Sequence, residues 1–188
     1  MYEIELKAHV DDRKSVIEKL GTFAGFLQSV QKDDIYWAIH KNGEKIQARI
    51  RKETDLETSE KKIYLTYKRK ENRIAENGKS YEVNDEKECE ISDSSALEAV
   101  FADSGFEIAL EKHKTVYGYQ YDECHIELCT VPPLGDFLEI EILSEKNDEE
   151  TVSEKRKLLL EVLRECGIPE EKIENRYYSE MLKGTQSK

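Results

Sequence analysis

Charged and apolar residues alternate along most of this chain, and that alternation constrains the fold more than any other feature of the sequence. A period of two is typical of a β-strand, whose successive side chains point to opposite faces. It recurs in eight stretches, at about 2–10, 29–39, 45–52, 62–70, 80–91, 107–119, 123–131 and 136–143. In the first stretch, Ile4, Leu6 and Ala8 share one face. Glu5 and Lys7 share the other. The sequence therefore predicts strands with one apolar face and one charged face.

A few segments with helical spacing interrupt or follow the strands. The first segment begins at about Asp12, and the second begins after Asp93 or Ser94. The third covers about 151–165, and a short fourth segment lies near 177–183. Apolar residues in each recur three or four positions apart, as on one face of an amphipathic helix. In the second helix, Leu97, Val100 and Phe101 are expected to point inward. The chain is therefore of the α+β class.

Two folds accommodate strands of this kind. An open antiparallel sheet would show its charged face to water and pack its apolar face on the helices. A closed eight-stranded barrel would instead keep the charges inside, with the helices packed outside. The periodicity alone favours the open sheet.

The charges are sorted by sign from strand to strand. Glu-x-Glu occurs in the first, fifth and eighth stretches, Arg-x-Arg in the third, and Lys-x-Lys in the fourth and sixth. Residues two apart on a strand lie about 6.6 Å from each other, so like charges repel unless something neutralises them. Carboxylate oxygens suit Mg²⁺ or Mn²⁺, and arginine and lysine suit phosphate oxygens. The charged face thus has the groups that metal-assisted binding of a polyphosphate requires.

Composition excludes several classes of protein. A length of 188 residues predicts a single domain over 1–188. The 29 basic and 41 acidic residues give a net charge of −12, which argues against a nucleic-acid partner. The chain has no run of 18 apolar residues and no apolar signal core at its start, so we expect neither a membrane partner nor secretion. Four cysteines without a CxxC pair fit free thiols in a reducing cytoplasm.

Short motifs follow one another in a familiar order along almost the whole chain. They are Glu3-Ile4-Glu5-Leu6-Lys7, Lys32-Asp33-Asp34-Ile35-Tyr36, Ala48-Arg49-Ile50-Arg51, Leu65-Thr66-Tyr67-Lys68, the acids Glu86, Glu88 and Glu90, Glu111 to Tyr117, Leu134 to Glu141, and Tyr177 to Leu182. This series resembles the CYTH superfamily, the triphosphate tunnel metalloenzymes. The segment LGDFLEIEI is most similar to the class IV adenylyl cyclase branch.

The resemblance implies a closed eight-stranded antiparallel tunnel with a charged interior and helices outside. It also implies an enzyme, most like an adenylyl cyclase that converts ATP to cyclic AMP and pyrophosphate. An inorganic triphosphatase or a thiamine triphosphatase is the alternative, and a non-catalytic polyphosphate-binding module is a further one. The resemblance to class IV cyclases also implies a possible partner, a second copy of the chain in a homodimer.

The resemblance also implies a role for each charged residue of the motifs. The ligands expected for Mg²⁺ or Mn²⁺ are Glu3, Glu5, Glu139 and Glu141, with Glu88 and Glu90 helping through water or ordering the bases. The groups expected to bind the triphosphate are Lys7, Arg49, Arg51, Lys68, Lys112 and Lys114. The candidate catalytic residues are Glu3, Glu5, Lys7 and Glu139.

Two positions depart from the family pattern. Cys129 stands where the family usually has aspartate, with Asp122 and Glu127 as nearby substitutes of uncertain register. Lys114 stands where the family has arginine, which keeps the charge but loses the two-pronged phosphate geometry.

Overall fold

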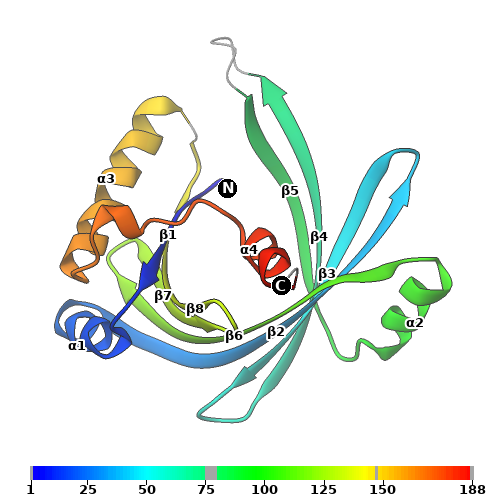
Figure 1. The fold of residues 1–188 in the computed structure, drawn as a ribbon, viewed down its shortest axis with the longest axis horizontal. Coiled ribbons are helices and arrows are strands. Elements are labelled where there is room, and N and C mark those ends of the chain that lie inside the picture. Colours follow the sequence, from blue (N-terminus) through cyan, green and yellow to red (C-terminus); the bar gives the residue numbers. More distant parts are fainter. Residues whose placement is uncertain (1, 75–79, 147, 187–188) are drawn as a thin grey trace. The chain divides into compact units, whose positions relative to one another are not determined.

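The predicted strands and helices are all confirmed in a computed structural model of the chain (Figure 1). The structure describes residues 2–74, 80–146 and 148–186, without the side chains of 68–86 and 185–186. The elements are β1 (Tyr2–Val10), α1 (Arg13–Phe23), β2 (Gly25–Lys41), β3 (Glu44–Asp55), β4 (Lys61–Ile74), β5 (Ser80–Ile91), α2 (Ser95–Asp103), β6 (Glu107–Tyr121), β7 (Cys124–Val131), β8 (Gly135–Ser144), α3 (Glu149–Glu165), the 3-10 helix η1 (Glu170–Lys172) and α4 (Tyr178–Gln186). None of the helices in these residues is long and apolar enough to cross a membrane.

The strands form one eight-stranded sheet with the order β1-β8-β7-β6-β2-β3-β4-β5. The pairs β1–β8, β8–β7, β7–β6, β3–β4 and β4–β5 are antiparallel. This confirms an α+β fold with an antiparallel sheet. The order has two end strands, β1 and β5, so closure of the sheet into a tunnel stays a prediction.

The chain divides into two compact units. The first unit contains residues 1–31, 55–57 and 114–188, and the second contains 32–54 and 58–113. Strands β2 and β6 each contribute residues to both units.

The apolar face of β1, β8 and β7 forms the core of the first unit. Leu6, Ile126 and Ile140 lie in this core with α1 and α3 packed against them. Each of these helices begins at an aspartate whose side chain accepts a hydrogen bond from a backbone N–H of the first turn: Asp12 from Ser15 at 3.0 Å, and Asp148 from Thr151 at 2.9 Å. The strand faces were thus predicted correctly here, and helices cover the apolar one.

Helix α4 lies on the other side of β1, β8 and β7 from α1 and α3 (Figure 1). Its Met181 joins a small apolar cluster with Phe137 and Val116, which share a sheet face with the charged residues. The rings of Phe137 and Tyr178 meet edge to face, with centroids 5.1 Å apart. The expectation that the helices all pack outside, on the apolar face, is therefore wrong for α4.

An aromatic cluster packs α2 in the second unit. The ring centroid of Phe101 lies 5.8 Å from that of Trp37 and 5.1 Å from that of Phe106. Leu97 is half-buried, as expected, but Val100 is 58% exposed. The inward orientation predicted for Val100 is wrong, because this nine-residue helix has no buried residue and makes its ring contacts through Phe101.

Candidate functional site

Strand register brings most of the predicted acids of the first unit onto one sheet face. Glu5 of β1 lies opposite Glu141 of β8, and Lys7 lies opposite Glu139. On its other side, Glu139 lies opposite Glu127 of β7. The acids expected to hold a metal are therefore neighbours, although they come from opposite ends of the sequence.

Lys114 of β6 reaches into this face as a buried cation. Its Nζ lies 2.7 Å from Glu127 Oε2 and 2.8 Å from Glu139 Oε2. Its side chain is only 6% exposed, and each glutamate is 13% exposed. Charges buried this deeply are tolerated only when they are paired and hydrogen-bonded.

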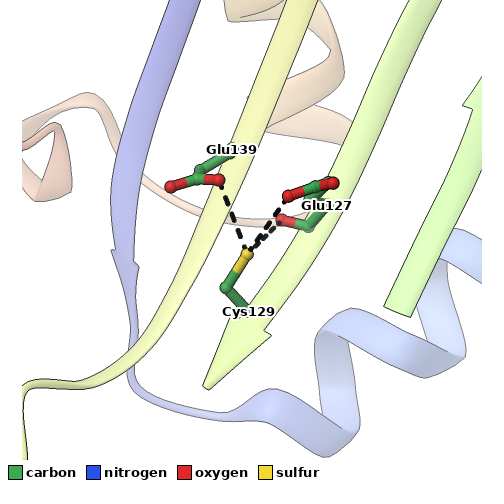
Figure 2. Close-up of side chains that lie close together, drawn as sticks. All are labelled: Glu127, Cys129 and Glu139. Atoms are coloured by element: carbon green, nitrogen blue, oxygen red, sulfur yellow. Dashed lines mark hydrogen bonds between the residues drawn. The ribbon is translucent and has the colours of Figure 1, made fainter. Parts of the chain in front are cut away.

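Cys129 completes the cluster around Lys114. Its Sγ lies 3.6 Å from Glu139 Oε2, 3.8 Å from Glu127 Oε2 and 3.7 Å from Lys114 Nζ (Figure 2). Figure 2 shows the thiol and both carboxylates converging from β7 and β8. Ligand atoms of Glu127, Cys129 and Glu139 all lie within 4.8 Å of one another, which is close enough to hold one metal ion. A thiol thus points toward the same point as two acids.

The pKa values of the cluster reflect this pairing. Burial acts to lower the pKa of Lys114, but the charges of Cys129, Glu139 and Glu127 outweigh it and raise that pKa well above its ordinary value. Burial likewise acts to raise the pKa of Glu139, and the charge and hydrogen bond of Lys114 outweigh it and lower that pKa. Both groups are therefore charged at neutral pH.

Glu5 and Glu141, farther along the same face, have raised pKa values. Burial and the charges of Glu139 and Glu3 raise the pKa of Glu5. Burial, together with a hydrogen bond and the charge of Glu3, raises the pKa of Glu141 to about 7. A cavity of about 410 Å³ reaches this point, lined by Gln120, Glu123, His125, Glu141 and Leu143. Glu3, Glu5 and Glu141 supply hard oxygen donors with unneutralised charge, and such a donor set fits Mg²⁺ or Mn²⁺.

Lys7 is held by the C-terminal segment of the first unit. Its Nζ donates to the backbone carbonyl of Arg176 at 2.6 Å and lies 4.4 Å from the centroid of the Tyr178 ring. Its own backbone carbonyl accepts from the N–H of Glu174 at 2.8 Å. The segment that leads into α4 therefore meets β1 at a candidate catalytic residue.

The second unit has its own buried ionic cluster, centred on Asp34 of β2. Arg51 donates to this carboxylate from Nε at 2.6 Å and from Nη2 at 3.0 Å. Lys112 Nζ lies 2.9 Å from Asp34 Oδ2. Burial acts to raise the pKa of Asp34, but the hydrogen bond from Arg51 and the charges of Lys112, Arg51 and Arg49 hold that pKa far below its ordinary value. Two predicted phosphate-binding residues are thus brought together by an acid.

A smaller network surrounds Arg49. Its Nη2 donates to Thr66 Oγ1 at 3.0 Å and to Glu88 Oε2 at 3.2 Å, and Thr66 Oγ1 donates to Glu88 at 2.6 Å. Glu90 is exposed on β5, opposite Tyr64. The side chain of Lys68 and that of Glu86 lie outside the described residues. The structure thus brings Glu88 to a predicted base, and the role expected for Glu88 stays a prediction.

The sequence prediction gave no definite role to two residues of these clusters, Glu127 and Asp34. Glu127 was considered only as a substitute of uncertain register, and Asp34 only as part of a motif. Glu127 stands two residues before Cys129 and Asp34 two residues after Lys32, so alternation does place both on charged faces. Lys112 and Lys114 were expected to act together, but they contact acids in different units.

The chain matches known proteins in sequence and in fold. A family model described as the CYTH domain matches residues 1–178. The chain belongs to the CYTH family. These CYTH residues include every charged group described above.

Relatives of this CYTH chain are recognisable at low identity. A Methanocaldococcus jannaschii protein named "Putative adenylate cyclase MJ0240" is 25% identical over 185 residues, which cover 96% of this chain and 98% of that protein. The solved structure of PH1819 from Pyrococcus horikoshii OT3 is 29% identical, with a TM-score of 0.76 and coverage of 98% of this chain and 99% of that chain. A putative adenylyl cyclase from Hippeastrum, HpAC1, described as having a dominant triphosphatase activity, is 17% identical with a TM-score of 0.61 and shares the fold over 99% of this chain and 95% of that chain.

Proposed function

We propose that this CYTH chain is a metal-dependent enzyme acting on a triphosphate, and that its reaction is that of a class IV adenylyl cyclase. The observation that carries the proposal is the pairing of buried cations with buried carboxylates in both units: Lys114 with Glu127 and Glu139, and Arg51 and Lys112 with Asp34. Cations fixed in this way are preorganised to receive phosphate oxygens. The name of the M. jannaschii relative supports the choice of cyclase.

The metal belongs to the acid-rich part of the first unit. We assign Glu3, Glu5, Glu139 and Glu141 as ligands of Mg²⁺ or Mn²⁺, because the raised pKa values of Glu5 and Glu141 mark carboxylates that lack a neutralising partner. When bound, such an ion supplies charge neutralisation to the triphosphate. Glu127 and Cys129 lie next to Glu139 and add further donors.

The bases of both units then bind the triphosphate. We assign this role to Lys7, Arg49, Arg51, Lys68, Lys112 and Lys114. Phosphoryl transfer depends mainly on positioning and on neutralising charge, and these residues supply both. In this proposal the strands close into a single-domain tunnel over 1–188, with the charged faces lining it.

The position of the triphosphate decides which phosphorus reacts. In a cyclase, the ribose 3′-hydroxyl attacks the α-phosphorus and pyrophosphate leaves. In a triphosphatase, water attacks the terminal phosphorus. Hydrolysis of inorganic or thiamine triphosphate is the alternative. The thiol of Cys129, at the position where the family usually has a carboxylate, favours the further alternative, a non-catalytic polyphosphate-binding module.

Product analysis separates these reactions. Purified protein is incubated with ATP, thiamine triphosphate or tripolyphosphate in Mg²⁺ or Mn²⁺, and the products are followed by phosphorus NMR. Cyclic AMP with pyrophosphate supports the cyclase, and orthophosphate supports the triphosphatase. Tight binding of all three compounds without any product would contradict both reactions and favour a non-catalytic polyphosphate-binding module.

A further inference from the structure

Asp34 is a fully buried carboxylate surrounded by cations. Its side chain is 0% exposed, whereas that of Arg51 is 15% exposed and that of Lys112 is 8% exposed. A carboxylate in such a position is costly to desolvate unless its oxygens are satisfied. Oδ1 accepts from Arg51 Nε, and Oδ2 lies within bonding distance of Arg51 Nη2 and Lys112 Nζ.

The two hydrogen bonds from Arg51 fix the plane of its guanidinium group. They use Nε and Nη2 and leave Nη1, which lies 3.7 Å from Glu53 Oε1. A guanidinium held along one edge can turn only a defined set of N–H groups toward another anion. Lys112 is brought to the same point from β6, so a single carboxylate places cations from two strands.

We propose that Asp34 is a positioning residue that holds Arg51 and Lys112 in the orientation in which they bind the triphosphate. This inference rests on the proposed function, in which both cations contact phosphate. The value of such a residue is that two long, flexible side chains are ordered before the substrate arrives, so binding does not have to order them.

A simpler role for Asp34 makes the opposite prediction. If Asp34 only neutralised charge, its carboxylate would weaken the attraction of the site for an anion. Its removal would then leave the site more positive and would strengthen binding of a polyphosphate. A positioning role predicts weaker binding despite the added positive charge.

The test is calorimetric titration of the full-length chain with inorganic tripolyphosphate. Asp34→Asn keeps the shape of the side chain and removes its charge. We expect the dissociation constant to rise about tenfold or more, since two side chains lose their order. An unchanged or lower dissociation constant would overturn the positioning role.

Asp33→Asn is the matched control, because it makes the same charge change one residue away. Asp33 Oδ1 lies 2.7 Å from His113 Nδ1 on the opposite face of the strand, and its side chain is 28% exposed. We expect the dissociation constant of Asp33→Asn for tripolyphosphate to stay within about twofold of the wild-type value, because an exposed ion pair contributes little. If both variants weaken binding equally, the loss is not specific to the position of Asp34, and the proposal is wrong.

A second measurement holds even if Asp34→Asn folds poorly. In the wild-type protein, the Nε–H signal of Arg51, assigned by its loss in Arg51→Lys, should be shifted downfield and slow to exchange. It should remain so after tripolyphosphate binds, because Asp34 keeps its hold. A signal that moves to the position of a solvent-exposed arginine on binding would show that phosphate replaces Asp34, which contradicts the proposal.

The double variant gives a third criterion. Arg51→Lys keeps the charge but loses the planar two-pronged contact. If the two residues act as one unit, Asp34→Asn combined with Arg51→Lys should bind no worse than the weaker single variant. Fully additive losses would contradict the proposal. A wild-type chain that fails to bind tripolyphosphate would instead reject the proposed function, and the role of Asp34 with it.

Discussion

Lys114 Nζ lies 3.7 Å from Cys129 Sγ, and both atoms contact the same two carboxylates. A lysine ammonium thus occupies the point toward which a thiol and two acids converge. Two properties follow that can be measured: how the cluster binds metals and how it depends on its internal cation.

Cys129→Asp should strengthen the binding of Mn²⁺. The change adds a carboxylate, and with it a negative charge, beside Glu127 and Glu139. We expect Mn²⁺ affinity to rise on the order of tenfold, because affinity for hard cations follows the charge of the ligand set. Electron paramagnetic resonance of free Mn²⁺ measures it directly.

The thiol itself can be tested with Co²⁺. Thiolate ligands suit softer metals, so the wild-type chain should show the absorption of a cobalt–sulfur bond that Cys129→Asp lacks. Cys124→Ser is the control, since Cys124 is a buried free thiol in the apolar core. Loss of the band in that variant instead would locate the bond elsewhere.

Lys114→Met should strongly destabilise the fold. It leaves Glu127 and Glu139 buried side by side without the ammonium group that they share, and breaking a buried ion pair in this way costs about 3–5 kcal/mol. Urea unfolding measures the change. The loss should shrink in acid, where the two carboxyls accept protons.

A less deeply buried lysine provides the comparison. Lys155 pairs with Glu123 at 2.6 Å, but these side chains are 24% and 39% exposed. Lys155→Met should cost less than about 1 kcal/mol. If the two lysine variants were equally stable, burial would not be what makes the Lys114 pair important.

Stability should fall as the pH rises from about 4.5 to about 7, because of Glu141. Burial and Glu3 raise the pKa of this carboxyl to about 7 in the fold, from the ordinary 4.5. Between these values the folded state holds a proton that the unfolded chain has lost, so each rise in pH favours unfolding. Glu141→Gln is neutral throughout, and its melting temperature should match the wild-type value near pH 4 and exceed it increasingly up to pH 7.

Glu161→Gln controls for net charge, since Glu161 is an exposed residue of α3. Its melting temperature should follow the wild-type curve at every pH. Wild-type and Glu141→Gln curves that run in parallel would show that Glu141 has its ordinary pKa.

Two glycines should respond to alanine in opposite directions. Gly167 follows α3 with a φ of +70°, where a Cβ is strained and would also meet Lys19, so Gly167→Ala should cost about 1–2 kcal/mol. Gly21 lies within α1 with open space around it, so Gly21→Ala should stabilise by about 0.5–1 kcal/mol. Chemical denaturation measures the free energy of unfolding of both variants. Changes of the same sign in the two variants would contradict the prediction.

The strands could be predicted because alternation is a local signal. Ile4, Leu6 and Ala8 follow one another at a period that only a strand satisfies, and all three are buried. Local spacing also located the aspartate that begins α1, Asp12. It could not tell which sheet face a helix covers, and this is why α4 was misplaced.

The partners of the site residues could not be read from the sequence. Asp34 and Arg51 are 17 residues apart, and Lys114 and Glu139 are 25 apart, so their contacts depend on strand register. Register is set by packing across the whole sheet and not by any one segment. Lys68 lies outside the described side chains. Sequence alone identified the other bases and several acids correctly as charged-face residues, and left open which acid holds which base.

The anchoring of Lys7 by the C-terminal segment makes position 178 a suitable place for a spectroscopic reporter. Tyr178 stacks on that ammonium group and also packs edge to face against Phe137. Any event that pulls Lys7 away from the Arg176 carbonyl must change the surroundings of this phenol ring. A fluorinated tyrosine at position 178 would therefore signal occupancy of the charged face without a label on any ionic residue.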